Sequence, residues 1–133
     1  NRKSKSVSVR TDASIPYYAN EFICVNRTKA DVTTPNVGTF STNGLFTFAE
    51  DMTALFVASI SGRPDSTGEY GLTLYDIPTT TNTIRISSMV AMQLDFSTVI
   101  KAKKGEQITL GTVEKFQMNS GGFASNMAVI RLD

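Results

Sequence analysis

Short runs of alternating apolar and polar residues, separated by turn-forming residues, dominate the chain. The first, Ser6 to Arg10, has the period of two that is expected of a strand with one buried face. Similar runs, rich in β-branched and aromatic residues, follow at Glu21–Asn26, Val37–Phe40, Leu45–Phe48, Thr53–Ser61, Glu69–Ile77, Ile84–Ile86, Met89–Phe96, Val99–Ala102, Gln107–Val113 and Asn126–Leu132. No segment keeps a helical period between capping residues. The pattern predicts an all-β sandwich of about ten antiparallel strands.

The segment Thr53 to Ser61 differs from the others because both of its faces are apolar. One face carries Ala54, Phe56, Ala58 and Ile60. The opposite face carries Leu55 and Val57. A strand of a lone sandwich needs only one apolar face, so this strand is expected to be covered on both sides. A second surface, such as that of another copy of the chain, would be needed to cover it.

Two pairings of strands are also expected. The turn at residues 103–105, Lys-Lys-Gly, is expected to close a hairpin between Val99–Ala102 and Gln107–Val113. The C-terminal strand Asn126–Leu132 is apolar enough to lie inside a sheet, and in a closed sandwich its neighbour is expected to be Ser6–Arg10.

Composition indicates one folded domain over residues 1–133, with residues 1–5 as a flexible or linker-connected N-terminal segment. Hydrophobic residues make up 41% and charged residues 19%, so the chain is neither disordered nor membrane-spanning in character. The net charge is +1, which argues against nucleic acid as a partner because phosphate binding needs a concentrated basic surface.

The residues that most often carry catalysis are missing. There is no histidine, and Cys24 is the only cysteine, which excludes the usual zinc sites and histidine-based triads. The carboxylates single out no glycosidase pair. We therefore expect a binding protein without a cofactor rather than an enzyme. Glu50, Asp51 and Asp65 are weak candidates for a calcium site, against the alternative that they are solvated loop residues.

The strongest candidates for ligand contacts lie in segments expected to be loops. Tyr17 and Tyr18 follow Pro16, and at least one of the two rings is expected to be exposed as a binding anchor. The segment Ser61–Gly68 is expected to be a loop. From it and the next turn we add three polar residues: Arg63, Asp65 and Asn82.

Two segments resemble the complement globular-head and tumour-necrosis-factor-like superfamily. Gly44, Phe46 and Thr47 match its Gly-x-Phe-Thr strand, and Phe56 matches a second aromatic position. Gly105, Ile108 and Leu110 match its Gly-Asp-x-Val-x-Leu segment, with Glu106 in place of the aspartate. The resemblance implies a ten-stranded jelly roll that forms a tight trimer, in which one sheet faces the three-fold axis and ligands bind at the apex or between subunits.

Three functions are compatible with these observations. The abundance of Thr, Ser and Asn without disulfides is frequent in bacteriophage tail fibres, so the first is a trimeric tail or baseplate module on the virion that recognises a host cell-surface saccharide. The second is a structural trimerisation or docking module for another fibre protein. The third is a secreted, complement-head-like adhesion ligand.

Overall fold

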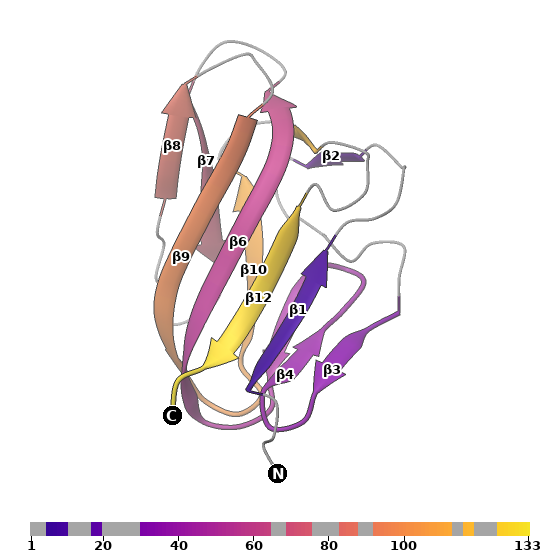
Figure 1. Ribbon diagram of the computed structural model, residues 1–133, viewed down its shortest axis with the longest axis vertical. Helices are drawn as coiled ribbons and strands as arrows, with labels where there is room; N and C mark the ends of the chain where they lie inside the picture. The colour runs from indigo at the N-terminus through magenta and orange to yellow at the C-terminus, as the bar shows by residue number, and fades with distance from the viewer. Residues whose placement is uncertain are drawn as a thin grey trace.

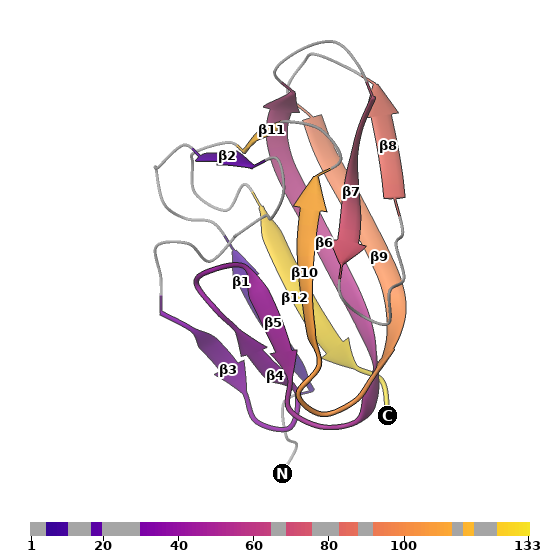
Figure 2. The same cartoon turned by 180° about the vertical axis from the view of Figure 1, so that it is seen from behind.

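The computed structural model describes residues 5–10, 17–19, 30–64, 69–75, 83–87, 92–112, 116–118 and 125–133. Within these ranges there are twelve β-strands and no helix. The strands are β1 (Ser6–Arg10), β2 (Tyr17–Ala19), β3 (Val32–Thr34), β4 (Gly38–Phe40), β5 (Leu45–Phe48), β6 (Met52–Pro64), β7 (Glu69–Tyr75), β8 (Thr83–Ser87), β9 (Met92–Ala102), β10 (Gln107–Thr112), β11 (Phe116–Met118) and β12 (Asn126–Arg131). All pairings are antiparallel, and the strands form two sheets packed face to face (Figures 1 and 2). The predicted all-β jelly roll is confirmed.

The first sheet, called sheet A, is organised around the long strand β6. On one side, β9 pairs with β6 from Met52 to Gly62. On the other side, β12 pairs with its first half and β11 with its last three residues. β1 pairs with β12, which confirms the predicted neighbourhood of the first and last strands. In Figure 1 this sheet faces the viewer, with both chain ends at its lower end.

The second sheet, sheet B, has the strand order β3-β4-β5-β10-β7-β8 and faces the viewer in Figure 2. The turn before β5 contains Asn43 and Gly44 and is closed by a hydrogen bond from Ser41 N to Leu45 O at 2.9 Å. Gly38 begins β4 against the ring of Phe46, where no side chain fits.

The core lies between the sheets and is built from the alternate positions that the pattern predicts. Its largest fully buried side chains are Phe46, Phe48, Phe56, Ile60, Ile108 and Leu110. In sheet B, the Phe46 ring packs against Phe40 and Phe48 at centroid distances of 4.8 and 4.9 Å. In sheet A, Phe56 packs against Phe96 at 6.0 Å. Such tilted and edge-on aromatic pairs add to the gain from burial.

Three local predictions are corrected. The turn at residues 103–105 does not close a hairpin: β9 pairs with β6 in sheet A, whereas β10 pairs with β5 and β7 in sheet B. The two segments predicted at Met89–Phe96 and Val99–Ala102 belong largely to the single strand β9. The loop predicted over Ser61–Gly68 is wrong in its first half, because β6 continues to Pro64, and residues 65–68 lie outside the described residues.

The N-terminal segment and several other predictions lie largely outside the described residues. Of residues 1–5 only Lys5 is described, and its carbonyl oxygen accepts a hydrogen bond from Arg131 N at 2.7 Å. The predicted strand Glu21–Asn26, with Cys24, is not among the described residues.

Candidate functional site

The outward face of sheet A carries an apolar surface. Along β6 the even-numbered positions from Met52 to Ile60 are buried, and the odd-numbered positions between them are half-buried. Leu55 lies directly opposite Ile130 of β12 on one side and Val99 of β9 on the other. Because directly opposed residues of antiparallel strands share a face, the three side chains form one apolar row across the sheet.

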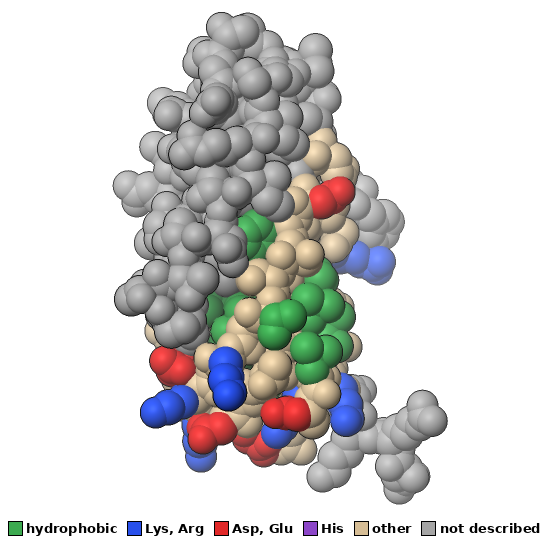
Figure 3. Space-filling view, turned by 90° about the vertical axis from the view of Figure 1, so that its left-hand side faces the viewer, with side chains coloured by type: hydrophobic (Ala, Val, Ile, Leu, Met, Phe, Trp, Pro, Cys, Tyr) green, Lys and Arg blue, Asp and Glu red, His purple; other side chains and the backbone are tan. Residues whose placement is uncertain are grey.

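Neighbouring positions enlarge this row into a patch. Val57 lies opposite Ala128, and Leu132 N donates to Thr53 O at 2.8 Å beyond the end of β12. We call the set Leu55, Val57, Val99, Ala128, Ile130 and Leu132 the outer apolar patch. Val99 is 61% exposed and Leu132 52% exposed, the two most exposed large hydrophobic residues among those described. Figure 3, which views the molecule from the left-hand side of Figure 1, shows hydrophobic side chains gathered above the charged lower end. A partly exposed apolar group of this kind is a candidate interaction surface.

A polar row bounds the patch on the side away from the chain ends. Arg10 pairs with Asn126, Asn126 with Ser59, and Ser59 with Asp95, so the row crosses β1, β12, β6 and β9, four of the six strands of sheet A. Ser59 Oγ donates to the Asp95 carboxylate at 2.7 Å. The outward face is therefore apolar in its middle and polar at its margin, which is the usual anatomy of a protein interface.

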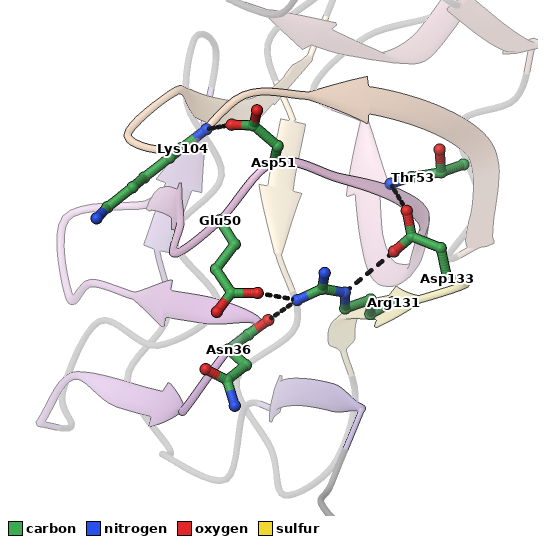
Figure 4. Close-up of polar contacts among 7 residues, drawn as sticks. All are labelled: Asn36, Glu50, Asp51, Thr53, Lys104, Arg131 and Asp133. Atoms are coloured by element: carbon green, nitrogen blue, oxygen red, sulfur yellow. Dashed lines mark hydrogen bonds and ion pairs between the residues drawn. The ribbon is translucent and has the colours of Figure 1, made fainter.

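The opposite margin is the charged lower end of the sandwich, centred on Arg131 (Figure 4). Its guanidinium donates to Asn36 O at 2.7 Å, to the Glu50 carboxylate, and to Asp133 Oδ1 at 3.0 Å. The hydrogen bonds to Glu50 and then to Asp133 raise the pKa of Arg131 above its usual value. The hydrogen bond from Arg131, followed by the one from the backbone of Thr53, lowers the pKa of Asp133. Arg131 thus joins the end of β12 to the segments that precede β4 and β6, and its role here is structural.

An open hollow lies beside this cluster, lined by Asp51, Met52, Thr53, Lys101, Ala102, Lys103, Glu106 and Asp133. Two of its carboxylates are engaged with the backbone of the neighbouring turn. Asp51 Oδ1 accepts from Lys104 N at 2.8 Å, and Glu106 Oε1 from Lys103 N at 2.6 Å. Of the calcium candidates, Glu50 contacts Arg131, Asp51 holds the turn, and Asp65 is outside the described residues. In the described ranges no three acidic, cysteine or histidine side chains gather as metal ligands.

The structure brings part of the predicted ligand site together. Tyr17 and Tyr18 lie in the short strand β2 rather than in a loop, and β2 pairs with β11. Gln117 of β11 lies opposite Tyr18 on one side and Arg63 on the other, so these two predicted residues occupy one row of three strands. Asp65 and Asn82 are outside the described residues.

The residues that the sequence pattern does not reveal are the patch members on β9 and β12. The alternation of β6 identifies Leu55 and Val57, but for Val99 and Ile130 it indicates only that each lies in a strand. Their signal is the register, which sets both beside Leu55.

The fold is similar to several solved structures. The structure of Eiger TNF from S. frugiperda aligns with a TM-score of 0.70 and 10% identity, covering 99% of this chain and 94% of that one. Murine APRIL aligns with a TM-score of 0.66 and 8% identity, covering 96% and 100%. The globular domain of zebrafish complement 1qA protein aligns with a TM-score of 0.59 and 16% identity, covering 94% and 95%.

Comparisons of the sequence alone add nothing to this, because no family model and no curated protein match the chain. At such low identities the structural similarities establish the jelly-roll fold that the sequence resemblance implies. They give no support to an origin in a phage tail. The described part of the chain contains no helix long and apolar enough to cross a membrane.

Proposed function

We propose that the chain is a single-domain, homotrimeric binding module of the complement-head and tumour-necrosis-factor-like kind, acting as an extracellular ligand. The observation that carries this proposal is the outer apolar patch on sheet A. Val99 is 61% exposed in one chain, and covering its side chain with a second chain would stabilise the assembly by removing apolar surface from water. The sequence resemblance implies the same arrangement, with one sheet turned toward a three-fold axis.

The structural similarities support this proposal more than the tail-fibre alternative. The structures with which the fold aligns over nearly the whole chain include a TNF, APRIL and a complement globular domain. The phage alternative rests on composition, which carries no information about a site. A binding role also fits a sequence without histidine.

The experiment makes one variant with two substitutions, Leu55→Glu and Val99→Glu, at patch positions that are directly paired on neighbouring strands. The mass measured by light scattering after gel filtration is expected to fall from that of a trimer to that of a folded monomer. The reason is that assembly of the variant would bury two additional carboxylates from each copy. The matched control is Gln107→Glu, an exposed position of sheet B, which is expected to remain trimeric. A double variant that keeps the mass of the wild type would refute the role of the patch.

Recognition of a saccharide is a second candidate, favoured by the row that contains Tyr18 and Arg63. Their Cα atoms are separated by two strand spacings, about 10 Å, which suits contacts to one sugar unit. A glycan array with the wild type, Tyr18→Ala and Arg63→Ala tests it. Binding that both substitutions abolish would support a sugar site there; an array without signal would leave the ligand module without a saccharide role.

A further inference from the structure

The turn between β4 and β5 contains a chemically reactive pair of residues, Asn43 followed by Gly44 (Figure 2). The side-chain amide of an asparagine can be attacked by the backbone nitrogen of the next residue. The attack is easiest before glycine, because no side chain shields the nitrogen. Asn43 is exposed, so water and hydroxide reach its amide.

The fold holds the two reacting groups of this turn in different ways. Gly44 N donates one hydrogen bond, to Ser41 O at 3.4 Å, which is longer than the usual length of about 2.9–3.0 Å. The need to break so weak a bond slows the attack by no more than about ten-fold. Ser41 Oγ donates to Asn43 Oδ1, and a donor at that oxygen draws electrons from the amide carbon and favours attack on it.

The other two asparagines among the described residues are placed less favourably for this reaction. Asn36 precedes Val37, whose branched side chain crowds the backbone nitrogen. Asn126 precedes Met127, which pairs with residues of both β1 and β6 in the middle of sheet A. Both asparagines therefore serve as internal controls within the same chain.

The contacts of the turn determine what the reaction would do to the fold. Ser41 N donates to Leu45 O at 2.9 Å, and Thr109 Oγ1 of β10 donates to Gly44 O at 2.8 Å. Thr109 is only 2% exposed, so water does not replace its hydrogen bond when that bond is lost. A longer main chain between Ser41 and Leu45 would break at least one of these two hydrogen bonds.

We propose that Asn43 is a site of spontaneous deamidation in the folded chain, and that its isoaspartate product loosens the turn between β4 and β5. Gly44 N attacks Cγ of Asn43, and the new C–N bond closes a cyclic imide. The Cγ–Nδ2 bond breaks, and Nδ2 leaves as ammonia with the proton that Gly44 N gives up. Water then opens the imide at either carbonyl, which yields aspartate or isoaspartate.

The isoaspartate product carries the structural consequence. Its main chain runs through the side-chain Cβ of residue 43 and is longer by one carbon atom. The inference goes beyond the proposed function and does not depend on it, because this turn belongs to sheet B and the outer apolar patch to sheet A.

The test of the reaction is ageing of the purified protein at mildly alkaline pH, followed by peptide mass spectrometry. Asn43 is expected to react at least about ten-fold faster than Asn36 and Asn126, and within about ten-fold of its own rate in concentrated urea. A rate no higher than at Asn36 or Asn126, or reaction of Asn43 only in urea, would overturn the proposal. The matched control Asn43→Ser, which lacks the amide, is expected to gain no charge at this turn.

The structural effect is measured on the isoaspartate form, separated from the aged protein by ion exchange. Its reference is Asn43→Asp, which carries the same new charge on a main chain of normal length. The equilibrium constant for urea unfolding is expected to be at least about five-fold larger for the isoaspartate form, because a buried hydrogen bond is lost. Equal unfolding of the two proteins would overturn the loosening of the turn.

Discussion

The carboxylate of Asp133 bridges two strands of sheet A, because Arg131 Nε donates to one of its oxygens at 3.0 Å and the backbone amide of Thr53 donates to the other at 3.2 Å. Both hydrogen bonds favour the ionised form, and they lower the pKa of Asp133 in the folded chain. The end of β12 is thereby fastened to the start of β6.

This bridge predicts a dependence of stability on acid. A carboxylate with a lowered folded-state pKa stabilises the fold above its unfolded pKa, about 3.9, and this stabilisation is lost as the pH falls through the folded-state value. Asp133→Asn is therefore expected to unfold more easily than the wild type at pH 7. The difference should shrink as the pH falls below about 4. Urea unfolding of both proteins at pH 7 and below about pH 4 measures this difference in the free energy of unfolding. A difference that grows in acid would contradict the stabilising role of the Asp133 carboxylate.

Gly38 and Gly105 provide a matched pair of glycine substitutions. A Cβ at Gly38 would lie 2.2 Å from Thr47 O and 2.4 Å from the Phe46 ring, whereas a Cβ at Gly105 would meet nothing within 4 Å. Gly38→Ala is expected to lower the free energy of unfolding by about 3 kcal/mol or more, through overpacking. Gly105→Ala, whose φ is 86°, should cost only about 1–2 kcal/mol of backbone strain. Equal losses in chemical denaturation would contradict the close approach of Phe46 to Gly38.

Phe46 is expected to be among the most sensitive positions of the core. It is 1% exposed and packs against both Phe40 and Phe48. Phe46→Ala should lower the free energy of unfolding by about 3–5 kcal/mol, since it removes burial and leaves a cavity. Leu45→Ala, on the half-buried outward position next to it, is the control and should cost clearly less. Similar losses at the two positions would mean that β5 does not present Phe46 to the core.

The sequence predicts those parts of the fold that depend on local alternation. The inward-facing residues of β6, such as Phe56 and Ile60, can be identified from the sequence because they recur with period two. The same alternation assigns Leu55 and Val57 to a second apolar face. The pairing of β1 with β12 follows from the closed architecture of a sandwich.

Pairings between distant strands are less predictable, and this explains the wrong hairpin. The turn at residues 103–105 is real, since Glu106 N donates to Lys103 O at 3.0 Å. Its sequence cannot tell whether the flanking strands pair with each other, because β9 finds its partner in β6 and β10 finds its partners in β5 and β7. The Arg131 cluster is also not predictable from the local sequence, because Arg131 meets Asn36, Glu50 and Asp133 only in the folded chain.

The mass of the wild-type chain in solution tests the central claim most directly. Sedimentation equilibrium at micromolar concentration is expected to give three times the chain mass of 14.5 kDa. A well-folded species of 14.5 kDa at that concentration, with the β-sheet signal of circular dichroism intact, would contradict the assembly through sheet A.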